Sequence, residues 1–182
     1  MIPAGYMAKK VAGWSEGFQK GSFEDIHSVS GCISENFTEY IPFWKHNGFW
    51  LFNSPEVIRS LAIEHSIDIT PCRFFYYEVF EQEFDQEKKQ WQTFEPEKDF
   101  ETAVQLPDKR QLEGYDVVTF LAHTSPECSP LSCNYFAGTI PVNQHCLLRS
   151  FEEAKQHIET GAFDNSEPGP VRIFAVYSVA IE

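Results

Sequence analysis

Runs of apolar residues along the chain predict a set of β-strands, two of them buried on both faces. Residues 72–84 begin with rings on both faces, and residues 171–181 are apolar on both faces throughout. Strands that are covered on both sides have such near-continuous apolar runs, so we expect both at the centre of a sheet. The run at 115–123 predicts a third buried strand. Weaker patterns predict strands at 5–12, 25–32, 49–52, 91–94 and 145–148.

Two helices are predicted from the residues that would cap them. Ser54 is followed by proline and glutamate, and Ser150 has Glu153 three positions later. Serine caps helix N-termini, proline suits the first helical position, and the Ser/Glu spacing is that of a capping box. The sequence therefore predicts helices over 55–65 and 150–160.

One turn stands out between these elements. The pair Asn47-Gly48 is the strongest short turn signal in the sequence, because both residues tolerate positive φ. It predicts a hairpin-like turn that leads into the strand at 49–52.

The chain also repeats itself in one register. An offset of 96 positions aligns His27 with His123 and Cys32 with Cys128, and it also aligns the two capping serines. Residues 27–65 share six identities with the segment 96 positions later. Because the predicted elements repeat in the same register, duplication is one interpretation and coincidence is the other.

These patterns favour an α+β fold: a largely antiparallel sheet with two capped helices, in a single compact domain over residues 1–182. If the repeat is real, the domain consists of two related halves about a pseudo-twofold axis. The halves would span 5–95 and 113–182, with a connector over 96–112.

Composition narrows the class of protein. Hydrophobic residues make up 42% and aromatic residues 15% of the chain, which is typical of a globular protein. The net charge of −13 argues against a nucleic-acid partner and against an anionic membrane surface. No secretory signal and no run of eighteen apolar residues is present. Five cysteines without an export signal favour reduced thiols and a soluble cytoplasmic protein.

Common catalytic motifs are missing from the sequence. It contains no G-x-G-x-x-G, no G-x-x-x-x-G-K-[ST], no H-E-x-x-H and no G-x-S-x-G. The sequence therefore gives no support to a dinucleotide-binding protein, a P-loop protein, a zincin or an α/β-hydrolase.

The loop 123–146 is the densest in candidate chemistry, with three of the five cysteines and two of the six histidines. Zinc prefers four thiolate or imidazole ligands, so the loop suggests a metal site. One candidate set takes a histidine and a cysteine from each repeat: His27, Cys32, His123 and Cys128. Another set comes from the loop alone: His123, Cys128, Cys133 and Cys146.

Two other interpretations of the same loop need no metal. Cys128 or Cys133 could be a reactive thiol, with His27, His123 or His145 as its base. Alternatively, the cysteines are small buried apolar residues, as free cysteine commonly is.

Aromatic residues gather at 37–52 and 74–77, in the first of the possible halves. They are either core or the lining of a groove between the halves that holds a small, partly apolar ligand. The candidate ligand-binding residues are Tyr40, Trp44, Lys45, His46, Asn47, Trp50 and Tyr77.

Two functional hypotheses follow. The first is a non-catalytic binding module that holds a small molecule or a protein partner at the aromatic-lined junction. The second is an enzyme that depends on Cys/His chemistry, with zinc or a reactive thiol in the loop 123–146. No cofactor other than zinc is suggested, and the oligomeric state is left open.

Overall fold

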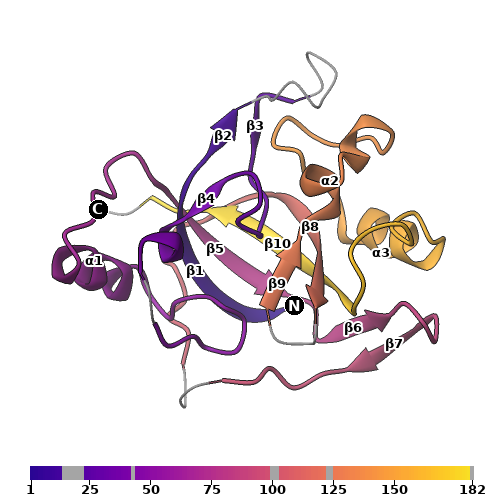
Figure 1. Ribbon diagram of the computed structural model, residues 1–182, viewed down its shortest axis with the longest axis horizontal. Helices are drawn as coiled ribbons and strands as arrows, with labels where there is room; N and C mark the ends of the chain where they lie inside the picture. The colour runs from indigo at the N-terminus through magenta and orange to yellow at the C-terminus, as the bar shows by residue number, and fades with distance from the viewer. Residues whose placement is uncertain (14–22, 42–43, 99–102, 122–124, 181–182) are drawn as a thin grey trace.

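The computed structural model describes residues 1–13, 23–41, 44–98, 103–121 and 125–180. In these residues the protein has a mixed α+β fold, with an eight-stranded sheet, a separate two-stranded sheet and three α-helices (Figure 1). Every strand pairing is antiparallel. In the same residues, no helix is both long enough and apolar enough to cross a membrane.

The strands are β1 (Ile2–Lys10), β2 (Ala12–Gly13), β3 (Asp25–Ile26), β4 (Glu35–Asn36), β5 (Arg73–Val79), β6 (Gln82–Asp85), β7 (Gln90–Thr93), β8 (Gln111–Leu121), β9 (Ser125–Cys128) and β10 (Val171–Ser178). The α-helices are α1 (Pro55–Glu64), α2 (Pro130–Cys133) and α3 (Phe151–Glu159). Two short 3-10 helices are η1 (Phe37–Tyr40) and η2 (Phe136–Gly138).

Strands β5 and β10 lie at the centre of the large sheet. They pair with each other, β1 flanks β5, and β8 flanks β10, while the β6–β7 hairpin also joins β10. Phe75, Tyr77, Ile173 and Ala175 are each at most 1% exposed, and so are Tyr76 and Phe174 on the opposite faces of the same strands. The prediction of two central strands buried on both faces is therefore confirmed.

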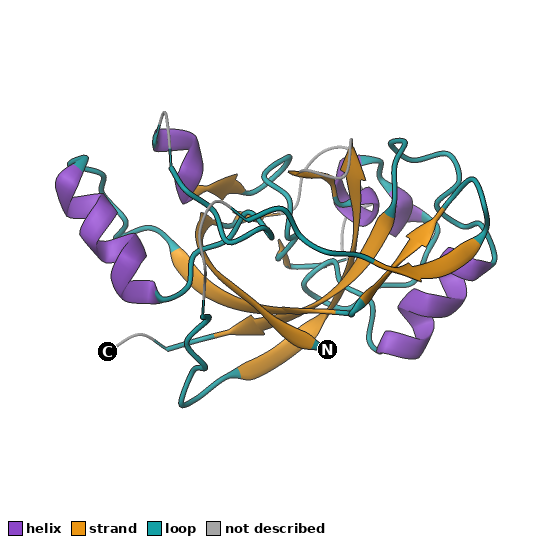
Figure 2. Cartoon of the chain, turned by 90° about the horizontal axis from the view of Figure 1, so that it is seen from below, coloured by secondary structure: helices purple, strands orange, loops and turns teal. Residues whose placement is uncertain are grey.

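Both predicted helices form, and they lie at opposite ends of the molecule (Figure 1 and Figure 2). Helix α1 buries Ile58 and Ala62, and helix α3 buries Ala154 and Ile158 at the equivalent positions 96 residues later. Each helix covers one of two apolar clusters. The first cluster contains residues of β1 and β5, and the second contains residues of β8 and β10.

A turn around Asn47 anchors the chain that precedes α1. The Asn47 amide Nδ2 donates to Ala4 O at 2.7 Å, and its Oδ1 accepts from the backbone N–H groups of Phe49 and Leu51 at 3.1 and 3.4 Å. Two residues farther along β1, Tyr6 forms an isolated β-bridge with Phe52.

A second turn, around Asn143, has the same contacts before α3. Its Nδ2 donates to Glu113 O at 2.6 Å, and its Oδ1 accepts from the N–H groups of His145 and Leu147 at 2.9 and 3.1 Å. Here Tyr115 bridges to Leu148.

The two turns also share backbone conformations that are uncommon. Trp50 and Cys146, 96 positions apart, have φ angles of 59° and 60°. Gly5 and Gly114 have φ angles of 132° and 150°, and a Cβ atom there would lie within 3 Å of the turn. The chain therefore passes each turn at a point where only glycine fits.

Several predicted elements differ from the structure. The prediction of a hairpin at Asn47-Gly48 is wrong. The side chain of Asn47 donates a hydrogen bond to Ala4 of β1, and the chain does not turn one strand back on another here. The predicted strands at 49–52 and 145–148 are single bridges. Only Asp25–Ile26 of 25–32 is a strand, and 72–84 is divided into β5 and β6.

Candidate functional site

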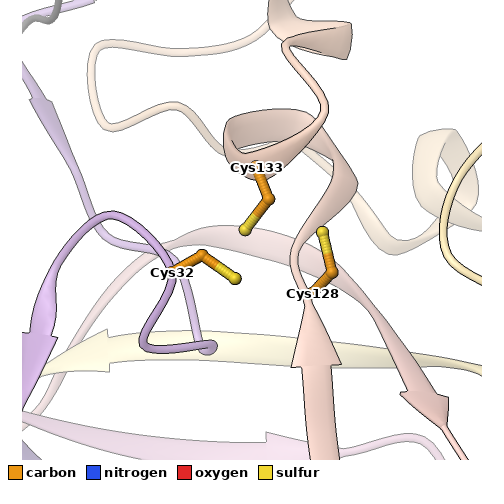
Figure 3. A group of neighbouring side chains, drawn as sticks. All are labelled: Cys32, Cys128 and Cys133. Atoms are coloured by element: carbon orange, nitrogen blue, oxygen red, sulfur yellow. The ribbon is translucent and has the colours of Figure 1, made fainter.

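Three cysteines converge where the loop after β3 meets β9 and α2. The sulfur atoms of Cys32, Cys128 and Cys133 all lie within 4.8 Å of one another. Figure 3 shows Cys32 on the loop, Cys128 at the end of β9 and Cys133 on α2, with their side chains directed toward a common point. Cys128 is buried, Cys133 is half-buried and Cys32 is exposed, so solvent reaches the group from one side.

Reciprocal hydrogen bonds between two serines hold these segments together. Ser30 N donates to Ser129 Oγ at 3.2 Å, and Ser129 N donates to Ser30 Oγ at 3.1 Å. The Ser30 hydroxyl also contacts the sulfur of Cys133 at 3.4 Å. Because Ser30 is two residues before Cys32 and Ser129 follows Cys128, these bonds fix the positions of the cysteines before any ligand binds.

Asp116 of β8 also joins the segment before Cys32 to the segment after Cys128. Its Oδ2 accepts from Val29 N at 2.7 Å and from Ser129 Oγ at 2.6 Å. The carboxyl is 1% exposed, and this burial raises the pKa of Asp116 to about 6.

Lys9 of β1 is buried next to the cysteines. Its Nζ donates to the carbonyl oxygens of Ser28, Val29 and Ser30, the last two at 3.2 and 2.7 Å. Burial lowers the pKa of Lys9 to about 7, and the negative charges that Asp116, Cys133 and Cys32 carry when ionised act in the opposite direction. The ammonium therefore contacts the buried side of the loop that carries Cys32.

The thiols influence one another. Hydrogen bonding with Cys133 and Cys32, together with burial, raises the pKa of the Cys128 thiol. A bound cation reverses this effect, because a coordinating thiol is deprotonated. The group is therefore suited to hold a thiophilic metal ion more than to supply a free nucleophilic thiolate.

A second group of polar residues lies around Asp25. Its Oδ1 is 2.5 Å from His145 Nδ1, and its Oδ2 is 3.1 Å from His27 Nε2. The two imidazole rings stack with centroids 4.2 Å apart. Burial lowers the pKa of His27 to about 4, so this ring is neutral at pH 7. His145 also pairs with Glu113, at 3.2 Å from Nε2.

Arg73 makes this second group an ion-pair network. Its Nη1 is 2.7 Å from Asp25 Oδ2 and 3.3 Å from His27 Nε2. The guanidinium therefore occupies the position between Asp25 Oδ2 and His27 Nε2 that a metal ion bound to both atoms would need. We interpret the group as a structural connection between β3 and the Asn143 turn.

The structure brings together only part of the first candidate metal set. Cys32 and Cys128 are neighbours, His27 belongs to the Asp25 network, and His123 lies outside the described residues. From the second set, Cys133 joins the sulfurs. Cys146 is buried and is not in either of the candidate groups found in the described part of the chain.

The candidate ligand-binding residues are in different environments. Trp44, His46 and Trp50 pack ring against ring, and His46 stacks on Trp50 with centroids 4.2 Å apart. Asn47 is 1% exposed and Tyr77 is fully buried, whereas Lys45 and Tyr40 are exposed. Tyr40 bonds to Lys10 and Glu35 at the surface. These residues therefore do not face one common cavity.

A groove does lie beside this region. It has a volume of about 640 Å³ and is lined by Ile2, Pro3, Asn47, Phe49, Glu95, Pro96, Lys98, Ala103 and Val104. Asn47 is the candidate residue that reaches it, and the packed rings of Trp44, His46 and Trp50 do not line it.

Sequence reasoning missed the residues that support both groups. Lys9 and Asp116 lie in apolar strands, and Asp25, Arg73 and Glu113 are isolated charges with no motif spacing. A charged residue inside an otherwise apolar strand is the signal that could have found Lys9 and Asp116, because buried charges require partners.

Comparison of the chain with protein-family models, with curated proteins and with solved structures found no match.

Proposed function

We propose that this protein binds a thiophilic metal ion, with zinc as the first ion to test, through Cys32, Cys128 and Cys133. The observation that carries the proposal is the convergence of three sulfurs from two segments that are distant in sequence. Zinc–sulfur bonds of about 2.3 Å place tetrahedral thiolates about 3.8 Å apart. The sulfurs, within 4.8 Å of one another, need to close only slightly to reach this distance.

The preparation of the site supports a binding role. Ser30, Ser129 and Asp116 bond the segments together without using the sulfurs as their main partners. Three protein ligands leave a fourth position for water or another molecule, as in catalytic zinc sites. The same geometry is therefore compatible with the alternative of a zinc-dependent or thiol-dependent enzyme.

Metal content is the direct test. Protein purified under reducing conditions without chelators should contain about one equivalent of zinc, or bind one equivalent of Co²⁺ with thiolate-to-cobalt charge-transfer absorption. Serine substitutions of Cys32, Cys128 and Cys133 should each abolish or strongly weaken binding. Cys72→Ser is the matched control, since Cys72 is half-buried and outside the group.

A contrary outcome is equally clear. If the reduced wild-type protein takes up neither zinc nor Co²⁺, or if the triple serine variant still binds a full equivalent, the three cysteines are not a metal site.

A second proposal keeps the small-molecule hypothesis and is favoured by the groove beside Asn47. Apolar side chains of Phe49 and Val104 line it, and Lys98 supplies a positive charge for an acidic group. Partly apolar carboxylic acids are the probes to use. Binding that survives in Phe49→Ala and Lys98→Met would exclude this groove as their site.

We also propose that the chain consists of two related halves, over 5–95 and 113–182. The support is the repeated set of contacts around Asn47 and Asn143. The pairing of β5 with β10 also supports it, because Glu78 pairs with Ala175 and Val79 pairs with Phe174, and the 96-position offset exchanges these two pairs. The paired substitutions described in the Discussion test this proposal.

We propose a cytoplasmic location because none of the five cysteines is in a disulfide bond, which fits a reducing compartment. Acid quenching of whole cells, followed by alkylation of the thiols in denaturant with a chelator present, tests it. Five alkylated cysteines per chain are expected, and a stable disulfide would contradict the proposal.

A further inference from the structure

We propose that Lys9 is a positioning residue of the thiol site: its ammonium orders the loop that carries Cys32 and supplies the positive charge that allows the three thiols to bind metal as thiolates. This inference rests on the metal site proposed above. It assigns a role to a residue that does not itself bind the metal.

The first argument is geometric. The Lys9 ammonium donates to three consecutive carbonyl oxygens, those of Ser28, Val29 and Ser30. Three carbonyls that converge on one nitrogen fix the path of the backbone immediately before Cys32. Since the Ser30 hydroxyl also contacts the sulfur of Cys133, the same few residues link Lys9 to both sides of the thiol group.

The second argument is the cost of the arrangement. Lys9 is fully buried, and a buried ammonium is unfavourable unless nearby groups compensate for its lost hydration. Carbonyl oxygens compensate in part, but an apolar residue at this place in β1 would fill the space without that cost. A buried lysine near the thiols of Cys32 and Cys133 is therefore best explained by a use for its charge.

The third argument is charge balance. With protonated thiols, Lys9 and the buried carboxylate of Asp116 compensate each other. Binding of Zn²⁺ to three thiolates adds one net negative charge to the buried group. With a neutral residue in place of Lys9, this negative charge would face the carboxylate of Asp116 without any compensating ammonium.

The experiment compares two neighbouring lysines in the full chain. Lys9→Met keeps an unbranched side chain that is one atom shorter and removes its charge, and Lys9→Arg keeps the charge. Lys10→Met is the matched control, because Lys10 is on the same strand but bonds to Glu35 and Tyr40 at the surface. Zn²⁺ affinity is measured by competition with a chelator, and Co²⁺ spectra report the number of bound thiolates.

Lys9→Met should weaken Zn²⁺ binding by about 10–100-fold, as supporting residues of metal sites do. It should also lower the thiolate-to-cobalt absorption per bound Co²⁺. Lys10→Met should change neither quantity, and Lys9→Arg should restore part of the affinity. Urea unfolding of the metal-free variants checks that each one is folded.

Two results would overturn the role of Lys9. One is wild-type Zn²⁺ affinity in a folded Lys9→Met protein. The other is weaker binding with an unchanged cobalt spectrum and no rescue by arginine, which indicates only a displaced loop. Failure of the metal site itself is distinguished from both, because the wild-type protein and Lys10→Met would then bind no metal.

Discussion

The turns around Asn47 and Asn143 have the same set of backbone conformations and asparagine contacts, which we call the turn frame, but they carry different side chains. In both, an asparagine bonds to a strand and to its own turn, a glycine makes room, and a residue with positive φ precedes the bridge. Two residues after each asparagine, the first turn has Phe49, which packs edge-on against Phe94, and the second has His145, which pairs with Asp25. Backbone conformations and the asparagine contacts therefore define the frame. The side chain two residues after the asparagine decides whether the turn makes apolar or polar contacts with the rest of the protein.

The largest expected effect breaks the frame at either glycine. In Gly5→Ala the new Cβ would lie 2.6 Å from Phe52 O, and in Gly114→Ala it would lie 2.7 Å from Leu148 O. Each variant should lose about 1–3 kcal/mol through backbone strain, and a further ~1–3 kcal/mol through overpacking. Urea unfolding measures the loss, and Gly138→Ala is the control because its Cβ position faces open space, with no atom of a more distant residue within 4 Å. A loss in only one of the two variants would show that the turns are not equivalent.

Removal of either asparagine should have the next largest effect. Asn47→Ala and Asn143→Ala each leave backbone groups without partners, which costs about 1–3 kcal/mol. Asn47 should cost more, since it is 1% exposed and Asn143 is half-buried. Unfolding free energies decide the order, with the exposed Asn165→Ala as a control. A larger loss at Asn143 would mean that its histidine network, and not the turn, carries the stability.

The helix caps sharpen the comparison. Ser150 Oγ accepts from Glu153 N at 3.1 Å, whereas the Ser54 side chain makes no capping hydrogen bond. Ser150→Ala should therefore destabilise the protein by about 1 kcal/mol, and Ser54→Ala should change the unfolding free energy by less than about 0.5 kcal/mol. Equal losses would indicate that Ser54 caps α1 in solution.

The smallest expected effect is on the pH dependence of the unfolding free energy, to which His27 beside the Asn143 turn contributes. His27, stacked on His145, has its pKa lowered from 6.5 to about 4, so the unfolded chain binds this proton first and acid destabilises the fold. Asp116 has its pKa raised from 3.8 to about 6, so the folded chain binds that proton first and acid stabilises the fold.

The two contributions oppose each other between about pH 4 and 6, and their sum should be small. Asp116→Asn removes one of them, so its unfolding free energy should fall more steeply with acid than that of the wild-type protein. Urea unfolding across this pH range checks the difference, and parallel curves would contradict it.

The predictable parts of the fold are those with local signals. Serine, proline and glutamate at the helix starts specify α1 and α3, and the apolar runs specify β5 and β10. Helix α2 has four residues, too few for any periodicity, and β4 and β9 exist only because they pair with β1 and β8. The Asn47-Gly48 turn was misassigned because its partner is Ala4, more than forty positions earlier.

The candidate site was predictable only in part for the same reason. The 96-residue register placed Cys32 beside Cys128, and the short spacing from Cys128 suggested Cys133. His27 does not join the cysteines as predicted, because its ring contacts Asp25 and Arg73 instead. No motif connects these two residues to His27 in the sequence. Lys9 is visible as a charge in an apolar strand, but its three carbonyl partners depend on the folded loop.

The central position of β10 has a consequence for synthesis of the chain. This strand follows all the others in sequence, yet it pairs with β5, β6 and β8. While the chain emerges from the ribosome, the aromatic strand β5 must therefore wait with one edge unpaired until Val171–Ser178 appears. Unpaired apolar edges favour aggregation, so the risk of aggregation is highest during this interval. The sheet is therefore completed at its middle, and only after Val171–Ser178 has been synthesised.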